Sequence, residues 1–498
     1  MNDAKEAALL DWFGARSQRH IETACAHVFL QPTLAYKLKR HVDLGYVDFS
    51  TLEKRRWALE RELSFNSLTA PDIYRAVRRV TRSAAGDLAL DGEGETVDVV
   101  LEMRRFDETA VLASDPSALD GTMAEALGRT IAGLHAQAPL RPDSGYPAMA
   151  WTVASNARLL RELGDDLGAE AVGQLIARTQ AELERQRPLL TARAAAGFSR
   201  RCHGDLHLGN ILVENGAPVL FDCIEFNDLL SDIDVQYDVA FLLMDLDFRG
   251  RRDAGVRVLS AYLDAASRVF PSQAVFEGLA ALPLMMAVRA AVRAHVCAHS
   301  GDLETARAYV AAGLAHLAPP SPRLAALGGL SGSGKSTVAR RLAPHLGAAP
   351  GAVILRTDEL RKRLAGAGPT EKLPPSAYAA EMNARVYQAM FDAAGVLLRA
   401  GHAVVLDATF IDPALRVRAR DLAMEVGTPF DAAWLEAPAP VLRARVGARR
   451  DDASDADLTI LEAQLSRDPG RGDWTVVDAS GDDADAARDC ARIWGLTT

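Results

Sequence analysis

The segment Gly329–Thr337, which reads GLSGSGKST, constrains the fold of this chain more than any other feature of its 498 residues. It fits the pattern G-x-x-x-x-G-K-[ST], in which glycines let backbone N–H groups wrap around phosphate oxygens at the start of a helix. The apolar run Leu324–Leu327 precedes the loop, and the helix-like stretch TVARRLAPHL follows it. The sequence therefore predicts a strand, a phosphate-binding loop and a helix in succession; a flexible glycine–serine linker is the alternative.

The side chains of this loop indicate how a nucleoside triphosphate would bind. We expect Lys335 to reach the β- and γ-phosphates and to take part in catalysis, and the hydroxyl of Ser336 to ligate Mg²⁺. The other expected nucleotide-binding positions are Gly329, Ser331, Gly332, Ser333, Gly334 and Thr337.

Short apolar runs that end in polar residues alternate with helix-like stretches after Pro322. The runs AVILRTD, AVVLDAT, DAAWLEA and TVVDAS predict a parallel sheet with crossover helices. Asp407 closes one run and is the expected carboxylate of the Mg²⁺ shell, while Asp358 closes another. Because the carboxyl ends of strands face the ligand crevice in open α/β sheets, both aspartates are expected to lie near the loop.

Asp358 followed by Arg361 one helical turn on resembles the substrate side of small P-loop kinases, such as gluconate, shikimate, chloramphenicol and polynucleotide kinases and zeta-type toxins. The resemblance implies that Asp358 is the catalytic base and Arg361 an anion clamp; a helix N-cap is the alternative for Asp358. The run VLRARVGARRDDASDADL resembles the lid of adenylate-kinase-like folds. We expect its Arg445 and Arg449 to close on the transferring phosphoryl group, with a solvated helix face as the alternative.

A second segment with several reactive side chains is RCHGDLHLGN, residues 201–210. It is followed by ILVENGAPVLFD, in which an Asn-Gly pair between two apolar runs predicts a β-hairpin because both residues accept positive φ. Folding this hairpin brings Asn210 and Asp222 to its open end, with Asp205 just upstream. Oxygen ligands without a nearby sulfur suit Mg²⁺ better than zinc, so the two histidines are expected to be structural.

The spacing of Asp205, Asn210 and Asp222 resembles the catalytic loop and metal aspartate of protein-kinase-like folds, and the form HGDLHxxN resembles the aminoglycoside phosphotransferase family. This resemblance implies that Asp205 orients and deprotonates an acceptor hydroxyl, while Asn210 and Asp222 hold Mg²⁺ on the phosphates of ATP. Gly204 stands where protein kinases usually carry the arginine that reads a phosphorylated activation loop. A small-molecule acceptor is therefore expected.

A kinase-like fold also requires a lysine on a small-lobe strand and a glutamate on the neighbouring helix. Lys37, in LAYK, is the expected ATP-binding lysine, with Lys39 ranked second. Glu62 is the expected partner, because Glu60 lies on a different face of the helix. Met103 marks the expected hinge that binds adenine. The sequence departs from kinases in one respect, since no G-x-G-x-x-G loop precedes Lys37.

The domain boundary is expected at APPSPR, where the helical periodicity of Gln273–Ala318 stops. The expected fold is an α+β, bilobal kinase-like domain over residues 1–320, followed by an α/β P-loop kinase domain over residues 324–498. The first domain would divide into a small lobe, about residues 1–107, and a helical lobe, about residues 108–320.

Composition excludes several classes of protein. Five scattered cysteines, none in a C-x-x-C spacing, argue against a disulfide framework and a structural zinc site, and favour a reducing cytoplasm. Charges interrupt the N-terminal 20 residues and no run of about 18 apolar residues occurs, so neither a signal peptide nor a membrane partner is expected. The net charge of −10 disfavours nucleic acid as a general partner, although the C-terminal arginines leave it open for that domain.

The two domains in this order resemble bacterial fusion proteins described as bifunctional aminoglycoside phosphotransferase-like and AAA/P-loop ATP-binding proteins. The resemblance implies two sites that use ATP and Mg²⁺, each phosphorylating a hydroxyl of a small molecule that is sugar-like or aminoglycoside-like. Two alternatives remain: a regulatory switch that senses a ligand and cycles ATP, and a polynucleotide 5′-hydroxyl kinase in the C-terminal domain. The sequence leaves the acceptors and the oligomeric state open.

Overall fold

The computed structural model describes residues 2–43, 47–448, 454–455, 457–467 and 472–496. The chain forms two compact units. The first comprises Met1–Ala118, Ala138–Thr152 and Gly197–Asp238, and the second comprises Leu119–Gln137, Val153–Ala196 and Val239–Thr498. The boundary expected between residues 320 and 324 falls inside the second unit, so the division of the chain at that point stays a prediction.

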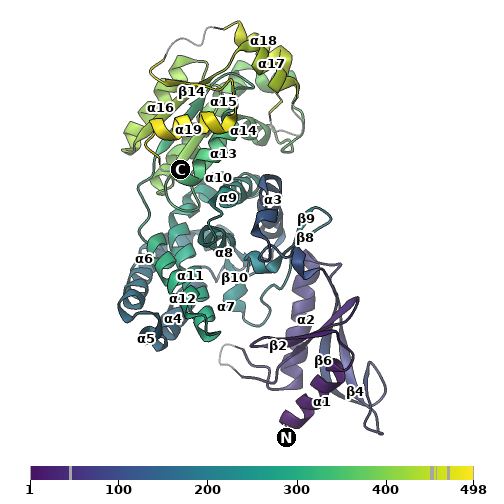
Figure 1. Ribbon diagram of the computed structural model, residues 1–498. Coiled ribbons are helices and arrows are strands. Elements are labelled where there is room, and N and C mark those ends of the chain that lie inside the picture. Colours follow the sequence, from purple (N-terminus) through teal and green to yellow (C-terminus); the bar gives the residue numbers. More distant parts are fainter. Residues whose placement is uncertain (1, 44–46, 449–453, 456, 468–471, 497–498) are drawn as a thin grey trace. The chain divides into compact units, whose positions relative to one another are not determined.

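The first unit contains a six-stranded antiparallel sheet with a helix on each face (Figure 1). Its strands run in the order β1-β2-β3-β6-β4-β5. Side chains alternate between the two faces of a strand, and in β3 Tyr36 and Leu38 join the apolar cluster of Leu9 and Phe13 from the first helix. The residues on the opposite face of β3 therefore point toward the second helix, α2; they are Ala35, Lys37 and Lys39. The elements are α1 (Asn2–Gly14), β1 (Arg19–Glu22), β2 (Ala26–Leu30), β3 (Leu34–Lys39), α2 (Leu52–Thr69), β4 (Tyr74–Arg82), β5 (Leu88–Leu90) and β6 (Glu95–Arg104).

The predicted hairpin is confirmed. β8 (Ile211–Glu214) and β9 (Ala217–Leu220) pair antiparallel, and Asn215 and Gly216 form the turn with φ of 50° and 74°. A second small ladder joins β7 (Ser199–Arg201) to β10 (Asp232–Asp234). The remaining short elements of this unit are the 3-10 turns η1 (Glu108–Ala110), η2 (Pro116–Ala118) and η3 (Leu208–Asn210) and the helix α7 (Asp228–Ser231).

The second unit begins with a group of helices, in which α3 packs on α9 and α11 packs on α12. Residues Ser272–His299 are long and apolar enough to cross a membrane, with a mean hydropathy of 1.6, but 78% of that window is buried inside the protein. Burial of this extent is usual for a core helix of a globular unit. The helices are α3 (Gly121–Gln137), α4 (Tyr146–Glu162), α5 (Gly164–Leu167), α6 (Ala169–Ala195), α8 (Val235–Phe248), α9 (Arg252–Ala266), α10 (Ser272–Glu277), α11 (Leu282–His299) and α12 (Leu303–His316), with η4 at Gly278–Ala281; α4 and α8 have their first residues in the first unit.

The predicted parallel sheet is confirmed in the same unit, with the strand order β12-β13-β11-β14-β15. β11 lies at its centre, where strands covered on both faces are apolar throughout. The strands are β11 (Leu324–Gly328), β12 (Val353–Arg356), β13 (Val404–Asp407), β14 (Phe430–Glu436) and β15 (Thr475–Asp478). The helices and turns are α13 (Lys335–Leu342), η5 (Ala343–His345), α14 (Thr357–Leu364), η6 (Pro375–Tyr378), α15 (Ala380–Arg399), α16 (Pro413–Val426), α17 (Ala439–Gly447), α18 (Leu458–Leu465) and α19 (Asp483–Ile493).

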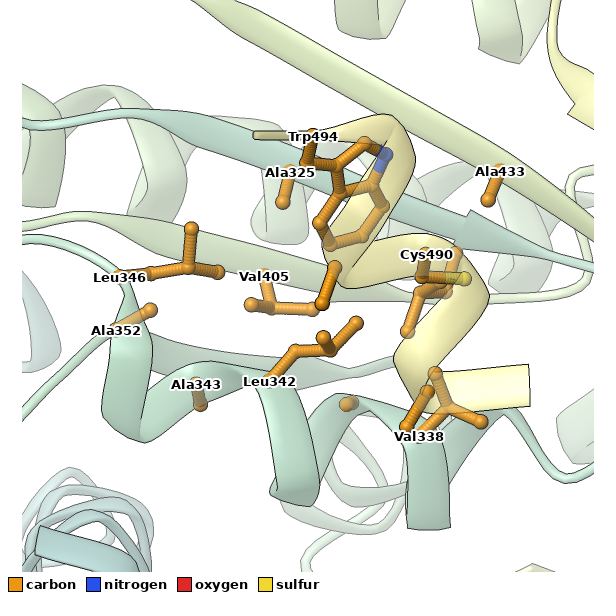
Figure 2. Close-up of a cluster of buried hydrophobic side chains, with 14 of the residues drawn as sticks. Ala325, Val338, Leu342, Ala343, Leu346, Ala352, Val405, Ala433, Cys490 and Trp494 are labelled. Carbon is orange, nitrogen blue, oxygen red and sulfur yellow. The ribbon is translucent and has the colours of Figure 1, made fainter. Parts of the chain in front are cut away.

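The core on one face of this sheet fixes the helix that follows the phosphate-binding loop. Figure 2 shows Leu342 of α13 beside Val405 of the sheet, with Cys490 and Trp494 of the C-terminal helix region above them. Val256 of α9 belongs to the same buried cluster. The start of α13, and with it the loop, is therefore held by apolar packing from several directions.

Candidate active sites

A chain of buried ion pairs lies between β3 and α2 in the first unit. Glu62 is fully buried, and its two oxygens accept from two lysines, 2.6 Å from Lys37 Nζ and 2.7 Å from Lys39 Nζ. Burial opposes ionisation of Glu62, but the two ammonium groups outweigh it and lower its pKa to about 2. The sequence paired Glu62 with one lysine, whereas the structure gives it two.

Lys37 also reaches the end of the hairpin, where its Nζ lies 2.8 Å from Asp222 Oδ1. Burial disfavours the charged form of Lys37, yet Asp222 and Glu62 raise its pKa well above the usual value. Asp222 has a positive φ of 62°, a backbone conformation that costs about 1 kcal/mol or more outside glycine. Its amide donates to Tyr74 Oη at 3.0 Å, which holds this conformation. The structure thus brings together Lys37, Glu62 and Asp222.

The catalytic-loop residues meet at the other side of the hairpin's open end. Asn210 Nδ2 donates to Asp205 Oδ2 at 2.9 Å, and Phe221 N donates to the Asn210 carbonyl at 3.1 Å. This bond places the residue before Asp222 beside Asn210. The Asn210 amide nitrogen faces Asp205, which leaves its oxygen as the atom able to ligate a cation.

Buried groups hold the loop that carries Asp205. His203 Nε2 lies 2.9 Å from the Phe221 carbonyl, and burial lowers the pKa of His203. Asp238 accepts from the amides of His203 and Gly204 at 3.1 and 2.8 Å. Gly204 has φ of 84°, and a Cβ there would lie 2.8 Å from the Leu230 carbonyl oxygen. Glycine is therefore required directly before Asp205.

Met103, the expected hinge, lies inside β6 and pairs with Ala35 on one side and Tyr74 on the other. Its backbone belongs to the sheet, because the strand continues to Arg104. The chain leaves the sheet at Arg105, the last residue of the run LEMRR, so a hinge at this end of β6 stays a prediction. The Met103 side chain joins the apolar cluster that contains Ala35.

The phosphate-binding loop of the second unit has the predicted form. Lys335 Nζ folds back over it, 2.9 Å from the Leu330 carbonyl and 3.5 Å from Ser333 Oγ. Gly332 has φ of 87°, and a Cβ there would lie 2.8 Å from the Leu442 carbonyl of α17. The loop glycines Gly329 and Gly334 also have positive φ, Ser331 and Ser333 are buried, and Thr337 lies in the first turn of α13. The linker alternative is therefore wrong.

Ser336 and Asp407 meet as predicted, with Ser336 Oγ donating to Asp407 Oδ2 at 2.6 Å. Arg356 Nε lies 3.3 Å from the same carboxylate, and Arg356 also pairs with Glu359 at 3.0 Å. Asp358 lies nearby in the first turn of α14, and burial raises its pKa. The N-cap alternative for Asp358 is wrong, because α14 begins at Thr357 and has no side-chain cap.

The buried side chain of Arg361 lies against Tyr378, which contacts a neighbouring ion pair. Arg361 donates to the Ala377 carbonyl at 2.9 Å, and its guanidinium lies 4.8 Å from the centre of the Tyr378 ring. Tyr378 Oη donates to Asp455 at 2.8 Å, and Lys362 Nζ lies 3.1 Å from the same carboxylate. These contacts hold the Arg361 guanidinium beside the polar groups of Tyr378 and Asp455.

One of the two expected lid arginines, Arg445, lies in the last turn of α17. Arg445 donates to the carbonyls of Ala479 and Gly481 at 2.7 and 2.5 Å, and so braces the loop after β15. Arg449 lies outside the described residues. Gln464 of α18 accepts from Ser331 N at 2.8 Å, so an α18 side chain contacts the phosphate-binding loop.

Sequence reasoning missed several residues of these sites. Three of them contact predicted residues that are distant in the chain. Glu225 contacts Lys39, Arg356 contacts Asp407, and Gln464 contacts Ser331. A weak signal existed for two of them, since Glu225 follows Asp222 by three residues and Arg356 ends the same apolar run as Asp358. Nothing local marked Gln464.

Comparisons with known proteins agree with this division into two kinds of site. A model described as the phosphotransferase enzyme family matches residues 50–279, and a model described as an AAA domain matches residues 324–468. Proteins of Mycobacterium tuberculosis (strain H37Rv) and Mycobacterium bovis, both called uncharacterized, are 31% identical to this chain over 496 residues. The match covers 95% of this chain and 94% of each relative.

Solved structures similar to this chain include a sugar kinase from Janibacter sp., with 19% identity and a TM-score of 0.29, and a gluconokinase from Sinorhizobium meliloti, with 22% identity and a TM-score of 0.25. Each match covers 35% of this chain, and 96% and 91% of the respective structures. Scores of this size define neither a shared acceptor nor a shared reaction.

Proposed function

Because this chain belongs to the same family as the mycobacterial proteins and joins a phosphotransferase-family domain to an AAA domain, we propose that it is a kinase with two ATP sites. Its two kinase-type domains indicate phosphotransferase activity and imply binding of ATP. The finer proposal is that each site transfers the γ-phosphoryl group of ATP to a hydroxyl of a small molecule, with Mg²⁺ as the metal.

The observation that carries the proposal for the first unit is the meeting of Lys37, Glu62 and Asp222 beside Asp205 and Asn210. The residues fit Mg²⁺, since the oxygens of Asn210 and Asp222 are hard ligands, and Asp222 is 43% exposed at the hairpin end. When bound, Mg²⁺ would neutralise charge on the ATP phosphates. Lys37 would bind a phosphate oxygen, while Asp205 would orient the acceptor hydroxyl and accept its proton.

In the second unit Lys335, Ser336 and Asp407 would hold the phosphates and Mg²⁺, by the geometry that P-loop proteins share. Asp358 is the proposed base, because burial raises its pKa and so makes its carboxylate more basic. Arg361, one turn along α14, would bind an anionic or polar part of the acceptor. A small hydroxylated metabolite is the proposed partner of each site.

The test uses the full chain and single variants of each site. Wild type, Asp205→Ala and Lys335→Ala would be incubated with [γ-³²P]ATP, Mg²⁺ and a library of sugars, sugar acids and aminoglycosides, and labelled products separated by chromatography. Glu60→Ala and Arg341→Ala, which change exposed residues of α2 and α13, are the matched controls.

Two kinase sites predict two sets of labelled products, one lost in each active-site variant and both kept in the controls. ADP release that ignores every acceptor would support a regulatory ATP switch instead. Label transferred to an oligonucleotide 5′ end, and lost in Lys335→Ala, would support polynucleotide kinase activity. Absence of nucleotide binding in both units would overturn the proposal.

A further inference from the structure

We infer that Lys39 and Glu225 are positioning residues of the first unit, which fix Glu62 and the segment after Asp222 while Lys37 and Asp222 change partners on nucleotide binding. This inference rests on the proposed kinase function of that unit. It assigns a role to the buried ion pair between Lys39 and Glu225.

Four ion pairs form two lysine bridges, which run side by side and share Glu62. Lys37 joins Glu62 to Asp222 at 2.6 and 2.8 Å, and Lys39 joins Glu62 to Glu225 at 2.7 and 2.6 Å. Lys37 and Lys39 are two residues apart on β3, so both project from one face of the strand toward α2. The two lysine bridges differ mainly in the carboxylate at their far end, which is Asp222 in one and Glu225 in the other.

The two lysine bridges also differ in their access to solvent. The side chains of Lys37 and Asp222 are 15% and 43% exposed, whereas those of Lys39 and Glu225 are 3% and 5% exposed. A nucleotide arriving from solvent therefore meets the Lys37–Asp222 ion pair first. Its phosphates attract Lys37 and its metal attracts Asp222, so the contact between these two residues is expected to open.

Glu62 shares the charge of Lys37 with a phosphate after this exchange, and a buried carboxylate whose charge is not fully compensated costs several kcal/mol. Lys39 supplies the missing compensation. Lys39 is buried and is held by two carboxylates, Glu62 and Glu225, so a nucleotide arriving from solvent does not meet it first. It therefore serves as the permanent counter-ion of Glu62, while Lys37 is the one that moves to the nucleotide.

The segment after Asp222 is also tied to α2 through its backbone. Arg61 Nε donates to the Glu225 carbonyl at 2.9 Å, and Cys223 N donates to Asn66 Oδ1 at 2.9 Å. These contacts tie two residues that follow the positive-φ Asp222 to α2, and Lys39 ties the same segment to β3. Loss of the Lys39–Glu225 ion pair would remove the side-chain link between β3 and this segment, and would therefore displace Asp222, the proposed metal ligand.

The inference is tested by nucleotide binding, which requires no known acceptor. Full-length protein carrying Lys335→Ala, which silences the P-loop site, would be titrated with mant-ATP with and without Mg²⁺. Lys39→Met should raise the Kd about tenfold when Mg²⁺ is present, as loss of a residue that supports a metal ligand typically does. It should change the Kd little without Mg²⁺. Lys39→Arg, which keeps the charge, should restore most of the affinity.

Further variants separate the possible failures. If Lys37→Met and Asp222→Asn abolish Mg²⁺-dependent binding but Lys39→Met and Glu225→Gln do not change it, the inference is wrong and the proposed function stands. If Lys37→Met and Asp222→Asn have no effect either, the proposed function of the first unit fails. Should Lys39→Met not fold, Glu225→Gln decides the matter: an unchanged Kd overturns the inference, and a rise of several fold supports it.

Discussion

Replacement of Glu62 by glutamine should destabilise the first unit by about 3 kcal/mol at neutral pH. The carboxylate is fully buried between two lysines, and these lower its pKa from the usual 4.5 to about 2. A difference of about 2.5 pKa units corresponds to about 3 kcal/mol of preference for the charged form. Removing one member of a buried ion pair costs about 3–5 kcal/mol, a similar size, because the remaining charges lose their partner.

The pH dependence gives a second check on the same carboxylate. The folded-state pKa of Glu62 lies below its unfolded-state pKa, so its contribution is complete above pH 4.5 and disappears as the pH falls through about 2. The difference in unfolding free energy between wild type and Glu62→Gln should therefore be constant from pH 5 to pH 8 and shrink below pH 4.

The assay is urea unfolding of the full chain followed by hydrogen-exchange mass spectrometry in peptides from β3 and α2, which reports on the first unit alone. With an m-value of about 2 kcal/mol/M, the midpoint should fall by about 1.5 M urea. Glu60→Gln is the matched control, because Glu60 is exposed on the same helix and surface changes usually cost less than about 0.5 kcal/mol. Equal midpoints for Glu62→Gln and Glu60→Gln would refute the reasoning.

Three further outcomes are expected. Gly204→Ala should lower stability by about 1–3 kcal/mol and disturb nucleotide binding in the first unit, because its φ is positive and the new Cβ would meet the Leu230 carbonyl; calorimetry showing a wild-type Tm would contradict this. Ser336→Ala should weaken Mg²⁺–ATP binding by the second unit while leaving its Tm nearly unchanged, as titration and thermal melts on the same sample can show. Burial lowers the pKa of His295 from 6.5 to about 4. The free energy of unfolding should therefore be unaffected by this histidine above pH 6.5 and fall by up to about 3 kcal/mol as the pH drops to 4. A His295→Gln variant with the same pH profile as wild type would argue against this.

Several features of the fold could be predicted because neighbours in sequence determine them. The Asn-Gly turn fixes the hairpin after Asn210, since both turn residues accept positive φ. The phosphate-binding loop is likewise local, since Lys335 donates to the Leu330 carbonyl within the nine residues of the motif. Alternating apolar runs and helix-like stretches were sufficient to predict the parallel sheet.

Other features depend on partners that are distant in the chain. Glu225 pairs with Lys39, which is 186 residues away in the chain, and Arg356 at the end of β12 pairs with Asp407 at the end of the neighbouring strand β13. The end of β6 near Met103 is likewise set by its pairing with two other strands and not by its own sequence.

The sequence by itself determined which local backbone shapes can cradle phosphate and which side chains can bind magnesium, since these follow from short-range φ preferences and residue chemistry. Only the tertiary structure decided that Glu62 serves two lysines and that Arg445 contacts the loop after β15. The physical reason is that a buried charge takes whichever partner the packing of the surrounding strands and helices brings within about 3 Å.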